Sequence, residues 1–381
     1  MWLARRAPRL VRRCRAPALP ARRFRGDDGG DIDVDAVAYG YMGSKALFAA
    51  LELGIFDHVA GAEVATIETL QTATGIDAPR LQTLVTALTA LRALERSDDG
   101  SYRPSPNAAK FLVRESDAYY GDYLQNQVGA QFYGQLDALA DVMRGERTPS
   151  YAAWFEEDSE AAEAYSLAQH NGSAATGRAL LRKARAGAFG AALQKGLALP
   201  EETALLDVGG GAGAFSYVFA GAGARAIVLD LPGVAAAGRR FQRTLVARGN
   251  VAADVASRVQ FADLDVTDDA WPVGAAAFDV VLMSYISGSI PDAALDDVYA
   301  NARAALKPGG ALVVHDFMVD DTLDGPPSAA LWALQHVTVS PEGLGLSPSA
   351  VAARLKAAGF GDVGDAAPLV AGMTRVIVAT K

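Results

Sequence analysis

Two patterns of apolar residues divide the chain. Up to about residue 195, apolar residues recur at the three- and four-residue spacing of amphipathic helices, as in residues 36–59 and 78–95. From residue 203, short β-branched runs such as ALLDVG, AIVLDL and FDVVLMSYI alternate with alanine-rich stretches. This alternation predicts an α/β domain with a parallel sheet covered on both faces. The last two runs, FGDVGDAAPL and TRVIVATK, predict an antiparallel hairpin that closes the sheet.

The N-terminal part has the pattern of a winged helix. Helical periodicity covers residues 36–59, 67–75 and 78–95, and ERSDDGSYRPS predicts a hairpin around Asp-Gly. A winged helix by itself suggests DNA binding. The helix that would enter the groove, PRLQTLVTALTAL, is almost uncharged and cannot neutralise phosphates, so we interpret it as a dimerisation surface of a homodimer.

The patterns predict four segments. Residues 1–26 form a targeting presequence, residues 27–113 a winged-helix-like dimerisation domain, and residues 199–381 the α/β domain. Between them, residues 114–198 predict longer helices rich in Tyr, Gln and Trp, which bridge the two domains and contribute to a substrate pocket.

The presequence prediction rests on composition. Residues 1–26 hold nine arginines and no acid, which is typical of an organelle-targeting segment. A mitochondrion is the favoured destination and a plastid the second, while a basic tail that binds an anionic partner is the alternative. Without these arginines the formal net charge would change from −9 to −18, and such an acidic protein would be repelled by nucleic acid.

Composition also excludes several kinds of chemistry. The single cysteine, Cys14, lies in the presequence, so the rest of the chain has no disulfide, thiolate nucleophile or cysteine zinc site. The four histidines show no metal-binding spacing, and we expect no metal. No apolar run approaches the roughly 18 to 20 residues that span a bilayer, so we expect no membrane association.

The stretch LLDVGGGAGAFSYVFA reads as a strand, a glycine turn and the start of a helix. Such a turn lets a ligand approach the backbone closely, although dinucleotide sites use a similar one. Three acids at strand ends favour S-adenosylmethionine over a nicotinamide: Asp207 before the turn, Asp230 for the ribose and Asp265 near the adenine. Their alternative roles are helix caps and solvated turns. The glycines in question are Gly209, Gly211 and Gly213.

The motifs DVGGGAGAF, VLDLPGV, LKPGGALVVHDF and LSPSAVAARLKAAGF, together with the winged-helix region, resemble the plant-type S-adenosylmethionine-dependent O-methyltransferase family. The resemblance covers nearly all of the chain after the presequence. It implies a seven-stranded, Rossmann-like class I methyltransferase domain. It also implies cofactor contacts from Asp207, Gly209, Gly211, Asp230, Leu231, Asp265, Val266 and Ser284, and from Ser173 on the bridging helices.

The chain departs from this family at the reacting end. Members that methylate hydroxyls usually carry a histidine just after the fourth strand, but here the stretch is SGSIPD, with Gly288 at the histidine's position. Asp316 matches an acid that orients this base. A hydroxyl loses its proton as it attacks, and a general base contributes roughly 10²- to 10⁴-fold to the rate.

Two explanations of the missing base remain open. Another histidine, His170 or His336, could replace it. Alternatively, the nucleophile is a thioether, which has no proton to lose and needs only positioning. The strings AYSLAQHNGSAATGRALL, SYISGSIPD and VVHDFMVDDTLDGPPSAALWALQHV are similar to S-methyltransferases that act on 4-methylthio-2-hydroxybutyrate in algal dimethylsulfoniopropionate synthesis. A third hypothesis is an inactive, cofactor-binding scaffold.

A small 2-hydroxy acid needs hydrogen-bond donors for its carboxylate and hydroxyl. We expect positioning by Gln169, His170 and Tyr133, although a helical Gln is usually solvated and a lone His often structural. An aromatic face would stabilise the nascent sulfonium by about 0.5 to 2 kcal/mol. The substrate-binding candidates are Gln127, Tyr133, Gln169, His170, Asn171, Tyr285, Trp332, Gln335 and His336.

Overall fold

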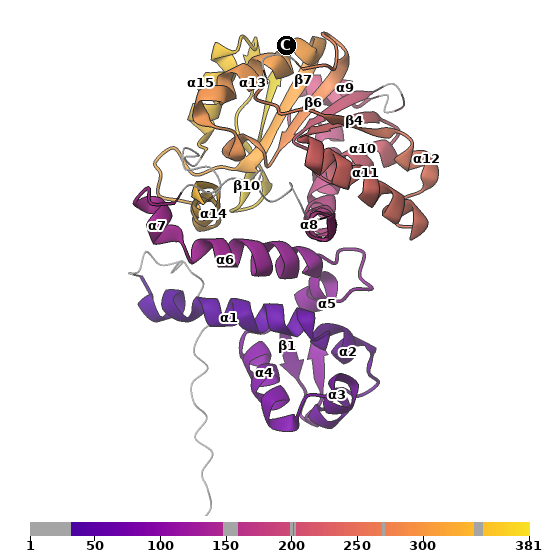
Figure 1. The fold of residues 1–381 in the computed structure, drawn as a ribbon, viewed down its shortest axis with the longest axis vertical. Coiled ribbons are helices and arrows are strands. Elements are labelled where there is room, and N and C mark those ends of the chain that lie inside the picture. Colours follow the sequence, from indigo (N-terminus) through magenta and orange to yellow (C-terminus); the bar gives the residue numbers. More distant parts are fainter. Residues whose placement is uncertain (1–31, 148–158, 199–200, 202, 269–270, 339–345) are drawn as a thin grey trace, which may run out of the picture.

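The computed structural model describes residues 32–147, 159–198, 201, 203–268, 271–338 and 346–381. The predicted presequence lies outside these residues. Figure 1 shows two bodies with helices between them: the N-terminal helices at one end, and the α/β domain at the other. No helix in the described part of the chain is long and apolar enough to cross a membrane.

The N-terminal domain confirms the predicted three-helix pattern and hairpin, but the third predicted helix, residues 78–95, ends at Ala90, and strand β1 begins at Leu94. The first predicted helix divides at Gly54, whose φ of 65° ends α1 and starts α2. Thr66 and Thr69 form a capping box that begins α3. The elements are α1 (Val34–Glu52), α2 (Ile55–Gly61), α3 (Ile67–Thr74), α4 (Ala78–Ala90), β1 (Leu94–Arg96), β2 (Tyr102–Pro104) and α5 (Pro106–Leu112).

Helix α1 has a row of apolar side chains that are exposed in the monomer. Val34, Val37, Tyr39, Tyr41 and Met42 are each at least half exposed. The buried core of this domain takes only Ala50 and Leu51 from the C-terminal end of α1, and otherwise includes residues such as Phe56, Leu81 and Leu88. A row of exposed apolar side chains of this kind marks a protein interface.

The bridging segment is helical, as predicted. It contains η1 (Tyr123–Phe132), a π-helix that continues into α6 (Tyr133–Leu136), then α7 (Leu139–Met143), α8 (Ser159–Arg185) and α9 (Ala191–Gly196). Figure 1 shows the continuous η1 and α6 helix alongside α1, and α8 below the α/β domain. Helices η1 and α8 pack against each other, η1 also contacts α1, and α8 also contacts α10 and α11. The two domains are therefore joined through η1 and α8.

The sheet of the α/β domain has the strand order β5-β4-β3-β6-β7-β10-β8, with β9 also pairing with β10. Strands β3 to β7 are parallel, and β10 runs antiparallel to β7. Because β8 and β9 pair with successive parts of β10, they share one place in the sheet, which agrees with seven strand positions and the predicted terminal hairpin. The strands are β3 (Ala204–Val208), β4 (Arg225–Asp230), β5 (Val259–Asp263), β6 (Phe278–Ser284), β7 (Leu306–Phe317), β8 (Asp362–Val363), β9 (Ala367–Val370) and β10 (Thr374–Thr380).

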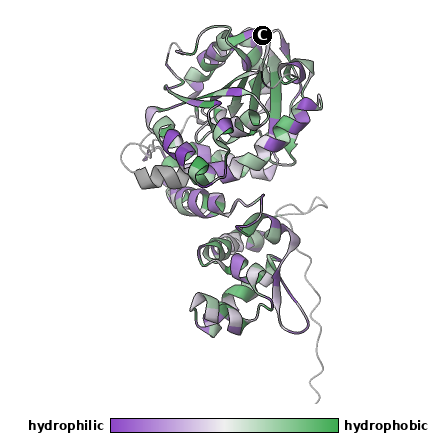
Figure 2. Ribbon diagram, turned by 90° about the vertical axis from the view of Figure 1, so that its right-hand side faces the viewer, coloured by the Kyte–Doolittle hydropathy of each residue, from purple (hydrophilic) through white to green (hydrophobic). Residues whose placement is uncertain are grey.

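Helices cover both faces of this sheet and bury two apolar cores. One core packs α8 and α10 against β3 and β4, and the other packs α13 and α15 against β6 and β7. Figure 2 shows the hydrophobic strands in the interior of the domain. The covering elements are α10 (Ala214–Gly221), α11 (Pro232–Ala247), α12 (Ala253–Ala256), η4 (Ser287–Ser289), α13 (Asp292–Ala305), α14 (Pro327–Val337) and α15 (Pro348–Ala357).

Candidate active site

A cavity of about 740 Å³ lies at the carboxyl ends of β3, β4 and β6. The strand order reverses between β3 and β6, which is where doubly wound sheets bind ligands. Residues of η1, α8 and α14 form much of the remaining wall, together with Phe317 of β7, Val370 of β9 and Thr374 of β10. The bridging helices η1 and α8 therefore contribute to the site as predicted. Its volume falls in the range of small-molecule sites.

The glycine turn after β3 forms one end of the cavity. Gly209 and Gly211 line it, with φ values of 64° and 57° that favour glycine. A Cβ on Gly211 would lie 1.8 Å from Oε1 of Gln169, so a larger residue would displace that side chain. The Asp230 carboxylate accepts hydrogen bonds from the backbone N–H of Gly211 at 2.7 Å and of Leu231 at 2.8 Å. Burial raises the pKa of Asp230 to about 6.

Gln169 bonds to the glycine turn itself, and Asp207 bonds to helix α10, which follows the turn. Oε1 of Gln169 accepts the backbone N–H of Ala212 at 2.9 Å, so this residue fixes the cofactor end of the cavity. Asp207 is buried and accepts the Ser216 hydroxyl at 2.7 Å. Burial raises the pKa of Asp207 to about 7. The predicted carboxylate role of Gln169 therefore competes with a structural one that the geometry shows.

The other predicted cofactor residues lie in the cavity wall, with one exception. Leu231, Asp265, Val266, Ser284 and Ser173 all line the cavity. Gly213 does not. It precedes α10 with a φ of 77°, and a Cβ there would lie 3.3 Å from Tyr217, so its role is to start the helix rather than to contact a ligand.

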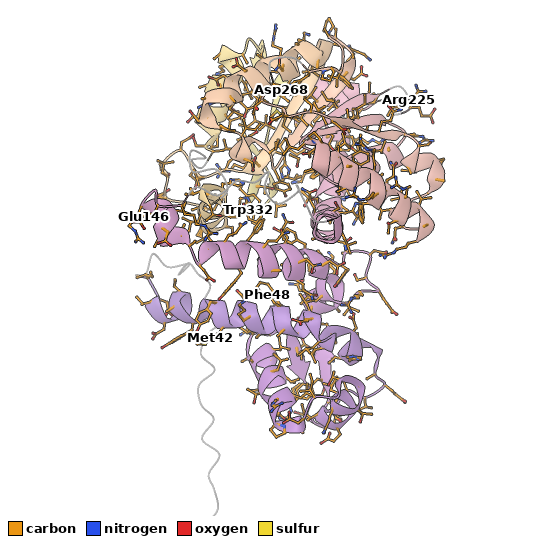
Figure 3. The ribbon with its side chains drawn as sticks, in the orientation of Figure 1. Met42, Phe48, Glu146, Arg225, Asp268 and Trp332 are labelled. Carbon is orange, nitrogen blue, oxygen red and sulfur yellow. The ribbon has the colours of Figure 1, made fainter. Side chains whose placement is uncertain are left out.

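Aromatic side chains form the other end of the cavity. The Trp332 indole stacks on Phe317, with ring centroids 4.2 Å apart and planes 13° apart, and meets Phe132 edge to face at 5.5 Å. Tyr285, which has a φ of 61°, lies beside Phe317. Figure 3 shows Trp332 at the edge of the α/β domain that faces the bridging helices. Tyr285 and Trp332, two of the predicted substrate-binding residues, thus line the aromatic end of the cavity.

His336 occupies the space beside Gly288. A Cβ on Gly288 would lie 2.5 Å from both Cε1 and Nδ1 of His336, so the glycine makes room for the ring. Nε2 of His336 accepts a hydrogen bond from the Trp332 indole N–H at 3.1 Å. Burial lowers the pKa of His336 to about 4. A histidine from α14 therefore lies next to the position where the family resemblance places one after β6.

Two glutamines and one asparagine complete the predicted polar set. Gln127 and Gln335 line the cavity and are buried, and Oε1 of Gln127 has no hydrogen-bond partner among the described residues. Asn171 also lines the cavity, but its amide donates to the Asp122 carboxylate at 2.7 Å.

Tyr133 and His170 lie outside this cavity, in contrast to the prediction. The Tyr133 ring packs against Phe48 and lies 3.7 Å from Nζ of Lys45 on α1. His170 projects from the other side of α8, where its ring meets Tyr217 and Phe241. Successive residues of a helix point about 100° apart, and here that step carries His170 out of the cavity that Gln169 lines and into contact with α10 and α11.

Asp316 and His315 lie beneath the site and are fully buried. Oδ1 of Asp316 accepts the Phe317 backbone N–H at 2.9 Å, while Oδ2 has no partner among the described residues. Burial raises the pKa of Asp316 to about 7. His315 is held between the hydroxyls of Ser284 and Thr374, at 2.8 and 2.9 Å, so its role is structural.

The sequence did not indicate several wall residues. Phe132, Phe317, Tyr120, Tyr123 and Thr176 line the cavity. The signal that could have found Tyr120 and Tyr123 is their place at the start of the Tyr- and Gln-rich bridging segment. Phe317 directly follows Asp316 at the end of a strand, where side chains of a doubly wound sheet face the ligand.

Comparisons with known proteins agree with this geometry. A model of the O-methyltransferase dimerisation domain matches residues 36–114, and a model of the O-methyltransferase domain matches residues 170–361. A 3-hydroxy-5-methyl-1-naphthoate 3-O-methyltransferase of Streptomyces sahachiroi is 30% identical over 78% of this chain and 80% of its own. Acetylserotonin O-methyltransferase of Bos taurus is 27% identical over 86% of this chain and 91% of its own.

A solved structure shares the fold. Human N-acetylserotonin methyltransferase in complex with SAM superposes with a TM-score of 0.73 at 21% identity, covering 91% of this chain and 96% of that chain. The chain belongs to the O-methyltransferase family. It is a methyltransferase that uses S-adenosylmethionine, with a class I catalytic domain and an N-terminal dimerisation domain.

Proposed function

We propose that this methyltransferase transfers the methyl group to a thioether sulfur, and that its substrate is 4-methylthio-2-hydroxybutyrate, which becomes 4-dimethylsulfonio-2-hydroxybutyrate in dimethylsulfoniopropionate biosynthesis. The observation that carries the proposal is the hydrogen bond from Trp332 to Nε2 of His336. This bond occupies the lone pair that a general base would use.

The tautomer of His336 follows from simple donor and acceptor rules. An indole N–H can only donate, so Nε2 of His336 accepts and carries no proton. Because the pKa of His336 is about 4, the ring is neutral near pH 7 and its single proton is on Nδ1. His336 therefore offers a donor to the substrate and has no unshared lone pair for a hydroxyl proton.

No other side chain at the aromatic end replaces this base. Among the described residues, the acids of the wall are Asp207, Asp230 and Asp265, and all three lie at the cofactor end. The phenol of Tyr285 has a pKa raised by burial, so it keeps its proton. The site thus favours a nucleophile that has no proton to lose.

A thioether reacts by in-line displacement without proton transfer. Bound S-adenosylmethionine would supply an activated methyl group. A thioether sulfur would bond to that methyl with a lone pair as the cofactor's S–CH3 bond breaks and S-adenosylhomocysteine leaves, and no proton would be released. The chain contributes alignment, worth up to about 7 to 11 kcal/mol, and exclusion of water. The aromatic group of Phe317 and Trp332 offers π faces to the new sulfonium.

The polar groups of the wall are neutral hydrogen-bond donors and acceptors, which can bind the carboxylate of a small acid without an opposite charge. Among the described residues no Lys or Arg lines the cavity, so a carboxylate would be bound by neutral donors. Nδ1 of His336 and the side-chain amides of Gln127 and Gln335 are available for this purpose, and Oε1 of Gln127 can accept the 2-hydroxyl proton.

A second candidate is O-methylation of a small hydroxylated molecule with His336 as the base. It is favoured by the position of the His336 ring, which lies against Gly288 next to the family's histidine position. It requires the Trp332 hydrogen bond to break, or the ring to turn over, before a hydroxyl can be deprotonated.

A substrate comparison separates the two candidates. Purified protein with labelled S-adenosylmethionine is given 4-methylthio-2-hydroxybutyrate, its analogue without the hydroxyl, and a panel of phenols and naphthols. We expect the hydroxy acid to be methylated at sulfur, with a higher kcat/KM than every other compound. Methylation of a phenol alone would replace our proposal by the O-methyltransferase, and no turnover of any compound would favour an inactive scaffold.

We further propose that residues 1–26 direct the protein to mitochondria, on the basis of their arginine content. Fusing residues 1–30 to a fluorescent reporter tests this. A mitochondrial signal is expected, a plastid signal would reassign the organelle, and a diffuse signal would reduce the segment to a basic tail.

A further inference from the structure

A second hollow of about 640 Å³ lies on the far side of α8 from the catalytic cavity. Its wall is formed by α8, by α10 and by the loop after α11, around Asn250 and Val251. Figure 1 shows α8 beside α10 and α11, which it contacts. Residues of α8 alternate between the two sites: Gln169 and Ser173 face the catalytic cavity, and His170 and Ala174 face this hollow.

Three arginines of α8 stand along this hollow. Arg178, Arg182 and Arg185 are spaced four and three residues apart, so they lie on one face of the helix. Arg182 and Arg185 form no ion pair with the residues that the structure describes, and Arg178 donates a 3.4 Å hydrogen bond to the backbone oxygen of Asp117. No acidic side chain is part of the described wall. In a chain of net charge −9, this is a local concentration of positive charge.

The rest of the wall is apolar and aromatic. Leu181, Ala214, Val218 and Val251 belong to it, together with the rings of Tyr217 and His170. His170 is neutral at pH 7, because burial and then the nearby Arg178 lower its pKa to about 4. Its Nδ1 is buried and has no hydrogen-bond partner among the described residues. A buried polar atom of this kind calls for a partner.

We propose that this hollow binds a small amphipathic anion, with its apolar or aromatic body on the wall between α8 and α10 and its carboxylate or phosphate on the guanidinium groups of Arg178 and Arg182. Guanidinium groups bind both kinds of anion through paired hydrogen bonds. Positive charges in the last turn of α8 would also stabilise the helix by interacting with its dipole. That interaction does not explain why the surface beside the arginines is apolar and has no acidic side chain. The proposal does not depend on the identity of the methyl acceptor.

The two sites share one wall residue, Ala214, which begins α10 directly after the glycine turn. The anion site is therefore distinct from the catalytic cavity but adjacent to the cofactor end of it. For this reason the binding experiment is done with the cofactor site filled by saturating S-adenosylhomocysteine.

Calorimetry with 1-naphthyl phosphate and 1-naphthoate, each compared with 1-naphthol, tests the proposal. We expect at least one of the two anions to bind, with an affinity that falls about tenfold in Arg182→Gln and further in the Arg178→Gln, Arg182→Gln double variant. Arg225→Gln, which removes the same charge from an exposed residue of β4, should leave the affinity unchanged. The phosphate and carboxylate arms show which head group is preferred.

Three results would overturn the proposal. They are equal binding of 1-naphthol and both anions, equal affinity of wild type and Arg182→Gln, or no binding of either anion. Because the arginines are exposed, the variants should keep the wild-type melting temperature, and this is measured alongside. Methyl transfer to the thioether acid is assayed separately, so a failure here leaves the proposed reaction unaffected.

Discussion

The indole N–H of Trp332 lies 3.1 Å from Nε2 of His336, one turn further along α14. The stacking of Trp332 on Phe317 and its edge contact with Phe132 hold the indole in place. The pair fixes a neutral imidazole with its proton on Nδ1, and this state binds an acid better than it deprotonates a hydroxyl.

The hydrogen bond from Trp332 implies a particular tautomer of His336, which can be measured by NMR. Nitrogen-15 NMR of the histidine-labelled protein should show one ring protonated on Nδ1, with no titration between about pH 5.5 and 8.5, because its pKa is about 4. Trp332→Phe removes the donor but keeps an aromatic ring, so this signal should move toward the Nε2-protonated tautomer. A wild-type signal already in the Nε2–H form would contradict the assignment.

Gly288 predicts a packing effect. Gly288→Ala places a Cβ 2.5 Å from the His336 ring, and we expect a loss of about 1 to 3 kcal/mol in the free energy of unfolding, with reduced activity. Gly134→Ala on α6 is the matched control, because no atom lies within 4 Å of its added Cβ. Denaturant unfolding measures both.

Gly288→His places a still larger side chain in the same space. We expect this variant not to increase the rate of thioether methylation, and an increase would contradict the packing of His336 against Gly288.

Asp230 predicts an effect on cofactor affinity. Asp230→Ala removes the carboxylate assigned to the ribose and frees the N–H groups of Gly211 and Leu231. S-adenosylmethionine should bind at least tenfold more weakly by calorimetry, about 1.4 kcal/mol. Asp263→Ala, which removes an exposed acid paired with Arg239 at the end of β5, should not change the affinity. An equal loss of cofactor affinity in both variants would contradict the assignment of Asp230 to the ribose hydroxyls.

Asp316 predicts a pH-dependent change in stability. Its folded-state pKa of about 7 lies above the unfolded value of 3.8, so ionisation of this carboxyl weakens the folded state as pH rises from about 4 to 7. Asp316→Asn cannot ionise. The free energy of unfolding of this variant relative to wild type should therefore rise from pH 5 to pH 8, by at most about 3 kcal/mol, and its relative melting temperature should rise with it. A difference that stays constant with pH would show that Asp316 is not buried in this way.

The cofactor end of the site could be predicted from the sequence because its residues are local. The glycine turn and the acids at the ends of β3 and β4 lie within a few residues of one strand and helix, and the parallel sheet brings them together. The aromatic end depends on contacts between distant segments. His336 meets Gly288 forty-eight positions earlier in the chain, through the placement of α14, and no local pattern specifies that meeting.

Helix phase explains the two misplaced candidates. Gln169 and His170 are neighbours in sequence, yet only Gln169 faces the cofactor end. Tyr133 directly follows the π-helix η1, whose wider turn changes which side chains face the cavity, and its ring instead meets Phe48 on α1. A periodic pattern read from the sequence assumes the ordinary α-helical phase.

The most direct test of base-free methyl transfer is the pH dependence of kcat with saturating 4-methylthio-2-hydroxybutyrate. We predict that kcat depends on pH in the same way in wild type and in His336→Gln from about pH 6.5 to 9, since no proton leaves the nucleophile and His336 does not titrate in this range. Any change below about pH 8 then reflects the buried acids Asp207 and Asp316, whose pKa values are about 7, and kcat should be constant above it. His336→Gln should mainly raise KM, because Gln retains a donor. A kcat that climbs through a single ionisation and collapses in His336→Gln would contradict the account and assign His336 as a general base.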